Sequence, residues 1–227
     1  MRIPHSGKPA YARNRGIEAA KGKYIFCLDH DDILLQNTLR NLASHLETTT
    51  ASEIAYGDFL RCNSAMVYEI GRDYYGWPHP NGRAALYSIF KGDHFYQHSF
   101  MFTKRLWHQV GGYDEAITYG EDLDLCIRFI LAGHLPIHLP ITTHMHREHG
   151  KNLTACYEYR SVWLAERQAH YRKYMHQLPL HLTPDQISDI QDALQIAAST
   201  HLNGPLSQKA AAALVNMGSG FAITCPA

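Results

Sequence analysis

The chain has 227 residues, 45% of them hydrophobic, and its 21 basic and 21 acidic side chains leave a formal net charge of zero. A chain of this length and composition can bury a substantial core, and its balanced charge provides no overall field to attract nucleic acid. We expect neither a signal peptide nor a membrane span, because no apolar stretch approaches the ~18 residues that a span requires. The five cysteines are odd in number and form no Cys-x-x-Cys motif, which favours reduced thiols and a cytoplasmic location.

The first informative segment reads ARNRGIEAAKGKYIFCLDHDD. Residues 10–20 have helical periodicity, and residues 24–28 form an apolar run of strand length. That run ends abruptly in a cluster of carboxylates, namely Asp29, Asp31 and Asp32. Carboxylates that follow a buried strand lie at the carboxyl edge of an α/β sheet, where such sheets bind ligands. Oxygen ligands of this kind suit Mg²⁺ or Mn²⁺. A solvated acidic turn is the alternative.

The middle of the chain alternates between helix and strand patterns. Helical periodicity covers residues 38–46 and 104–110, and strand patterns cover residues 53–60, 66–70, 95–103 and 135–139. Residues 71–85 are rich in Gly, Pro, Tyr and His, which indicates a loop. Aromatic side chains in this loop could stack on sugar rings and form part of an acceptor site. A packed surface loop is the alternative interpretation.

A second acidic cluster lies in the sequence GGYDEAITYGEDLDLCIRFILAGH. Leu123, Ile127 and Ile130 recur at helical spacing, which predicts a buried helix. Glu121 and Asp122 then occupy its first turn, where the helix dipole favours negative charge by roughly 0.3–1 kcal/mol. Simple capping of the helix is therefore one interpretation. Capping does not account for the Gly-Gly-Tyr-Asp sequence just upstream.

Taken together, these two acidic segments and their separation resemble the family 2 glycosyltransferases, over about residues 4–155. The resemblance implies an α/β fold, a partial GT-A mixed sheet flanked by helices. It also implies transfer of a sugar, with inversion, from a nucleotide-diphosphate donor to a saccharide or other hydroxyl acceptor. In the pattern of this family, Asp29 and Asp31 bind the donor and its Mn²⁺ or Mg²⁺. Asp122, preceded by Glu121, takes the position of the catalytic base.

A later basic segment, HMHREHGKNLT, is similar to the Arg-x-His stretch of the same family. The resemblance places Arg147 near the diphosphate and His149 near the metal. Arg13 is a further candidate for contact with the donor, and a surface position on its helix is the alternative.

The sequence departs from the family at its beginning. Family members start with a strand, a helix and a second strand that hold the nucleotide base and ribose, and this sequence starts after all of them. We therefore expect an amino-terminally truncated domain that binds nucleotide weakly. Such a domain exposes a strand edge, so we also expect poor solubility or a homo-oligomer formed through that edge.

The second part of the chain is expected to be helical. We divide the chain into a partial GT-A domain, residues 1–155, and a helical extension, residues 156–227. Helix patterns cover residues 157–175, 184–202 and 207–217, with Thr183 as an N-cap and Pro184 at the first helical position. The extension could pack on the catalytic domain, mediate association, or contact the inner face of a membrane peripherally.

Two other functions are compatible with parts of the sequence. The spacing of His144, His146 and His149 could bind zinc and support a metallohydrolase, although this leaves the Glu121-Asp122 pair without a role. A non-catalytic remnant that binds a sugar or a partner is the third hypothesis, because the elements that hold the nucleotide are missing.

Overall fold

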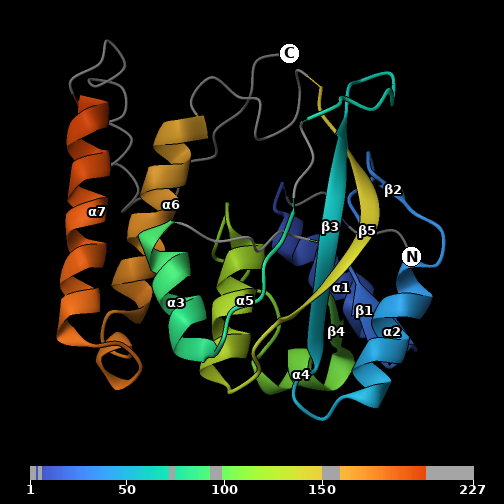
Figure 1. Ribbon diagram of the computed structural model, residues 1–227, viewed down its shortest axis with the longest axis horizontal. Coiled ribbons are helices and arrows are strands. Elements are labelled where there is room, and N and C mark those ends of the chain that lie inside the picture. Colours follow the sequence, from blue (N-terminus) through green and yellow to red (C-terminus); the bar gives the residue numbers. More distant parts are fainter. Residues whose placement is uncertain (1–3, 5–6, 72–74, 93–98, 150–158, 203–227) are drawn as a thin grey trace. The chain divides into compact units, whose positions relative to one another are not determined.

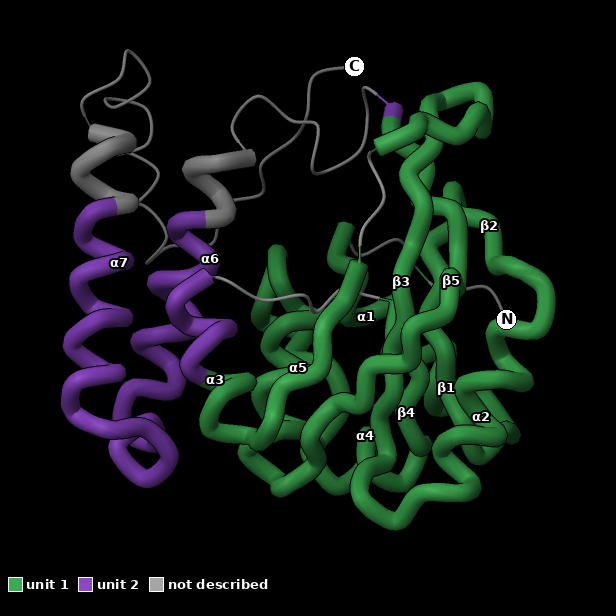
Figure 2. The backbone as a smooth tube through the Cα atoms, viewed as in Figure 1, with its two compact units in different colours: residues 1–86, 94–148 green, residues 87–93, 149–227 purple. Residues whose placement is uncertain are grey.

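A computed structural model describes residues 4, 7–71, 75–92, 99–149 and 159–202. The chain divides into two compact units, which are coloured separately in Figure 2. The first contains residues 1–86 and 94–148, and the second contains residues 87–93 and 149–227. None of the described helices has the length and apolar character needed to cross a membrane.

The first unit is built on a mixed five-stranded sheet (Figure 1). Its strands lie in the order β1 (Tyr24–Phe26), β4 (Met101–Thr103), β3 (Ile54–Cys62), β5 (Ile137–Arg147) and β2 (Ile33–Leu34). The long strands β3 and β5 are parallel, and the other neighbours are antiparallel. A mixed sheet flanked by helices confirms the predicted fold class.

Each face of the sheet has its own hydrophobic cluster. On one face, side chains of β3 and β4 pack with α1 (Pro9–Ala19), α4 (Lys104–Gln109) and α5 (Glu121–Leu131). The rings of Phe100, Phe102 and Phe129 lie at the centre of this cluster, with centroids 5.4–6.4 Å apart. On the other face, Ala55 and Met101 pack with α2 (Thr38–Thr48). Alternate residues of a strand point to opposite faces, so β3 and β4 contribute side chains to both clusters.

The second unit contains α6 (Tyr159–Tyr174), the 3₁₀ helix η2 (Leu178–Leu180) and α7 (Pro184–Leu202). Thr183 and Gln186 form a reciprocal capping box at the start of α7: the Gln186 amide donates to the Thr183 hydroxyl, and the Thr183 amide donates to the Gln186 side chain. The predicted N-cap is therefore confirmed. The predicted helix at residues 207–217 lies outside the described residues.

Several predicted elements differ from the observed ones. The last strand, β5, runs to Arg147 instead of residue 139, because the β-branched residues 141–143 extend its pairing with β3. Only a single bridge, Cys62 to Tyr68, forms where residues 66–70 were expected to be a strand. Strand β2 and helix α3 (Gly82–Lys91) were not expected. A strand was predicted at residues 95–103, and the observed strand β4 covers only the last three of them. Residues 93–98 lie outside the described part of the chain.

Gly57 allows β3 and β5 to approach closely. A Cβ atom at this position would lie 2.5 Å from the Ile141 carbonyl oxygen and 2.6 Å from Thr143 Cγ2. We therefore expect Gly57→Ala to push these strands apart and lower the free energy of unfolding by about 1–3 kcal/mol. The control is Gly16→Ala in α1, where an added Cβ meets no described atom within 4 Å. It should stabilise the helix by roughly 0.5–1 kcal/mol. Urea unfolding of both variants measures these effects, and wild-type stability of Gly57→Ala would contradict the close approach.

Candidate functional site

The two acidic segments meet at one edge of the sheet. Strands β1 and β3 are both antiparallel to β4 and hence run in the same direction. The Asp29 segment follows the carboxyl end of β1, and Glu121 begins α5. The Arg13 guanidinium of α1 links the two: Nη2 lies 2.9 Å from Asp29 Oδ1, and Nη1 is hydrogen-bonded to Glu121 Oε1. Three of the residues predicted to form the site are thus in direct contact.

Arg13 is held inside the protein and does not lie on its surface. Its side chain is only 13% exposed, and its guanidinium carbon lies 5.7 Å from the centre of the Tyr113 ring. The alternative of a surface helical arginine is therefore wrong. Helical periodicity alone could not show this, because both partners of Arg13 come from distant parts of the sequence.

The two carboxylates at the start of α5 have different surroundings. Glu121 is buried, and burial together with the neighbouring Asp122 charge raises the pKa of Glu121 to about 7, although Arg13 acts in the opposite direction. Asp122 is partly exposed, and its Oδ1 accepts a hydrogen bond of 2.8 Å from the Leu123 amide. The buried residue of the pair therefore connects α5 to Arg13, and its neighbour Asp122 remains partly accessible to solvent.

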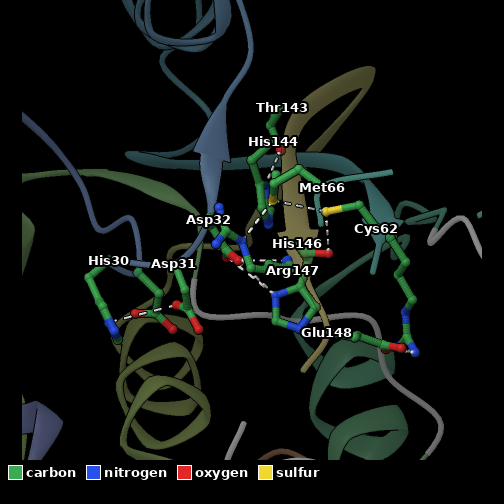
Figure 3. A network of polar contacts seen from close by, with 12 residues as sticks. His30, Asp31, Asp32, Cys62, Met66, Thr143, His144, His146, Arg147 and Glu148 are labelled. Atoms are coloured by element: carbon green, nitrogen blue, oxygen red, sulfur yellow. Dashed lines mark hydrogen bonds and ion pairs between the residues drawn. The ribbon is translucent and has the colours of Figure 1, made fainter. Parts of the chain in front are cut away.

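Asp32 has a structural role that the sequence did not reveal. Its side chain is 0% exposed, and it accepts hydrogen bonds from the Arg147 amide (3.0 Å) and from the His146 ring (3.3 Å to Oδ2), as Figure 3 shows. Asp31, next to it, remains partly accessible and lies 3.7 Å from the His30 ring. Asp32 thus ties the acidic segment to the end of β5, and it holds the backbone of Arg147 in place.

His144 and His146 of β5 contact neighbouring residues of the first unit. The His144 ring stacks on Phe59 with centroids 5.1 Å apart, and the His146 ring contacts Asp32. The third histidine of the proposed zinc site, His149, is the first residue after the first unit. Within the described part of the chain, no three His, Cys, Asp or Glu side chains are close enough to hold a metal ion. The zinc hydrolase hypothesis therefore has no support in the geometry.

The side chain of Arg147 lies among sulfur atoms. Its Nε donates to Met66 Sδ at 2.8 Å, and Cys62 Sγ lies 3.4 Å from the same sulfur (Figure 3). The contact with the neutral thioether fixes the direction of the guanidinium, which is charged at neutral pH. The arrangement is compatible with the diphosphate contact that the resemblance assigns to Arg147.

An open cavity of about 730 Å³ lies along β1. Arg13, Asp29 and His30 contribute polar groups to its lining, and Ile17, Phe26 and Leu34 are among its apolar lining residues. Pockets for small ligands commonly have volumes of roughly 300–1,000 Å³ and combine an apolar wall with a few polar groups. The cavity has a suitable size and chemistry for a nucleotide-containing ligand, and Asp29 and Arg13 take part in both the cavity and the acidic centre.

The comparisons with known proteins agree with this geometry. Residues 2–111 match the model of glycosyl transferase family 2. The mixed sheet with flanking helices is of the GT-A type found in solved glycosyltransferases. Residues 2–111 are therefore similar to glycosyl transferase family 2, and the fold of the first unit is of the glycosyltransferase type.

Individual relatives are distant. Over 132 residues, 55% of this chain, the sequence is 27% identical to the uncharacterized protein y4gI of Sinorhizobium fredii (strain NBRC 101917 / NGR234), and the match spans only 13% of that relative's length.

Two solved structures resemble the fold. The S. aureus TarS 1-349 complex with UDP-GlcNAc has a TM-score of 0.51 and 14% identity, covering 95% of this chain and 71% of that one. The Pyrobaculum calidifontis mannosyltransferase PcManGT, in complex with GDP-Man and Mn²⁺, has a TM-score of 0.53 and 16% identity, covering 97% and 57%.

Burial of Glu121 predicts a pH-dependent stability. Folding raises its pKa from 4.5 to about 7, so the folded protein keeps this proton at pH values where the unfolded chain has lost it. The stability from this group is complete below about pH 4.5 and is lost as the pH rises to about 7. Glu121→Gln cannot titrate, so the unfolding free energy of the wild type minus that of the variant should fall across this window. Denaturant unfolding at several pH values measures the difference, with Glu18→Gln on the surface as control. A pH-independent difference would contradict the buried carboxyl.

Proposed function

We propose that this domain transfers a sugar from a nucleotide-diphosphate donor to an acceptor hydroxyl with inversion at the anomeric carbon. The observation that carries the proposal is the contact of Arg13 with both Asp29 and Glu121 in a domain similar to family 2. This contact brings Asp29 and the helix that bears Asp122 together at one edge of the sheet. A cavity suited to a nucleotide lies beside it, and ligands of α/β sheets bind at such edges.

The donor would lie in the cavity along β1, with Asp29 and Arg13 at its polar end. Arg147 would supply a fixed positive charge for the diphosphate, because its guanidinium is directed by Met66 and its backbone is held by Asp32. The similar solved structures support a nucleotide-sugar donor, because they contain UDP-GlcNAc and GDP-Man.

We further propose that Asp29 and Asp31 hold Mn²⁺ or Mg²⁺. His149, the third ligand that the resemblance implies, belongs to the second unit and is left out of this proposal. Both carboxylates are partly accessible, and Mg²⁺ is commonly bound by one or two carboxylates together with substrate phosphates. The donor set therefore fits the ion without a cage of three protein ligands. A bound cation would offset the negative charge that develops on the leaving diphosphate. PcManGT, which has a similar fold, was solved with Mn²⁺.

Asp122 would act as the general base. Its carboxylate lies at the amino terminus of α5, where the helix dipole favours the charged form. As the acceptor oxygen forms its bond to the anomeric carbon, Asp122 takes the hydroxyl proton. The bond from that carbon to the diphosphate oxygen breaks, and its electron pair leaves with the nucleotide. Glu121 would position Asp122 through its link to Arg13.

The wider setting is proposed on the same basis. Residues 1–155 would form the catalytic domain and residues 156–227 the helical extension. We place the enzyme in the cytoplasm, at the inner face of the membrane or free of it, in the synthesis of a cell-surface polysaccharide. Because β1 is one of the two outer strands among the described strands of the sheet, its edge could pair with a second copy of the chain.

Replacing Asp122 by Asn tests the base. The side chain keeps its shape and its contact with the Leu123 amide, but it can no longer accept the acceptor proton. Turnover should fall roughly 10²–10⁴-fold, and nucleotide binding should be unchanged. Asp185→Asn is the matched control, because Asp185 also lies in the first turn of a helix, α7, and is exposed. Initial rates of nucleotide release with donor and acceptor measure the effect. Near-normal turnover of Asp122→Asn would exclude it as the base.

Melting temperatures test the metal. For the wild type, millimolar Mn²⁺ with a nucleoside diphosphate should raise the melting temperature, because a ligand at a hundredfold excess over its dissociation constant stabilises the folded state by about 2.7 kcal/mol. Asp31→Asn should abolish most of this shift. Asp192→Asn, an exposed aspartate of α7, should retain it. If the wild-type melting curve does not move with metal and nucleotide, the metal site is wrong.

A further inference from the structure

A short aromatic segment, residues 75–79, is anchored firmly to the sheet of the first unit. The Gly76 amide donates to Asp58 Oδ1 at 2.8 Å, and the Tyr56 hydroxyl donates to the Trp77 carbonyl at 2.6 Å. Both anchors are side chains of β3, and both residues are buried. The Asp58 carboxylate is itself held by His138 Nε2 at 2.8 Å. Consecutive residues of the segment are thus fixed by buried groups.

Although the backbone is fixed, the rings of this segment face solvent. Tyr75 is 64% exposed and Trp77 is 39% exposed. The Trp77 ring also lies edge-on to His79, with centroids 6.2 Å apart. Covering large aromatic side chains is favourable, and a segment whose backbone is already fixed loses little backbone freedom on binding. The segment therefore has the properties of a preformed binding surface.

The Tyr56 anchor of the segment packs in the same hydrophobic cluster as Leu125 and Phe129 of α5, the helix whose first turn carries Asp122. Asp122 and Cys126 are four residues apart and share one face of the helix. The Asp122 charge adds to burial in raising the pKa of the Cys126 thiol, and Cys126 in turn adds to burial in raising the pKa of Tyr56. Such effects require proximity, and Tyr56 bonds directly to the carbonyl of Trp77. Tyr56 thus contacts both the core of α5 and the backbone of the aromatic segment.

We propose that Tyr75 and Trp77 form a platform for the acceptor saccharide. A pyranose presents C–H groups on its faces, which pack on aromatic rings, and hydroxyl groups around its edge, one of which could be directed to Asp122. The role of the platform in acceptor binding rests on the proposed transferase function, but sugar binding itself does not require transfer.

Direct binding to the full chain tests the platform without donor. Ligand-observed NMR with cellotetraose, chitotetraose and maltotetraose should detect binding of at least one of them to the wild type. Trp77→Ala and Tyr75→Ala should each weaken it about tenfold, which corresponds to ~1.4 kcal/mol, and Trp77→Phe should restore most of it. Tyr68→Ala is the control, because Tyr68 is as exposed as Trp77 but lies outside the segment. Absence of binding to all three sugars, or equal losses in Tyr68→Ala, would overturn the proposal.

Two further measurements separate this proposal from the transferase function. Nucleotide-dependent shifts in melting temperature should be the same in Trp77→Ala as in the wild type, which also shows that the variant is folded. Tyr56→Phe removes only the hydroxyl that anchors Trp77 and should weaken sugar binding without changing nucleotide binding. If sugar transfer occurs and the acceptor KM is unchanged in Trp77→Ala and Tyr75→Ala, the function stands and the platform is wrong. If sugar binding depends on Trp77 but no transfer is found, the platform stands alone.

Discussion

The arrangement of the site depends on one guanidinium. Arg13 contacts Asp29 after β1 and Glu121 at the start of α5, and all three groups are wholly or partly withdrawn from water. A buried carboxylate without a cation is costly, and removing one partner of such a pair typically costs about 3–5 kcal/mol. Arginine suits this position because its planar fork can bind two carboxylates in fixed directions. The distance between Asp29 and the start of α5 is therefore set by α1, which belongs to neither element.

The neighbouring residue of α1 explains the Gly-Gly-Tyr-Asp sequence. Asn14 exchanges two hydrogen bonds with the backbone of Tyr113, each 2.9 Å long. A Cβ atom at Gly112 would lie 2.9 Å from the Trp107 ring, and φ at Gly112 is +75°, so this turn requires glycine. Arg128 of α5 donates to the Val110 carbonyl at 2.8 Å. The turn is thus fastened to α1 and to α5, and it keeps the Arg13 side of α1 facing Glu121.

The parts of the fold with strong local signals could be predicted from the sequence. The buried face of α5, the extent of α2 and the Thr183 cap follow from residues within a few positions of one another. The partners of Arg13 could not be predicted in this way, because they depend on which strand lies beside which. Helix α3 was not predicted for a different reason. The Gly- and Pro-rich residues before it have the composition of a loop, and the apolar pattern around its Ala-Ala-Leu sequence is short.

Burial divides the carboxylates of the site into two kinds that the sequence presents as equivalent. Asp32 lies within the run that also contains Asp29, yet it is enclosed and bonded to the backbone of β5. Glu121 is enclosed beside the accessible Asp122. An enclosed carboxylate that already accepts internal donors has little capacity left for a ligand, whereas an accessible one can still bind a cation or a proton. Each acidic segment therefore contains one enclosed residue that fixes its position and at least one neighbour that stays accessible to solvent, and only the tertiary contacts show which is which.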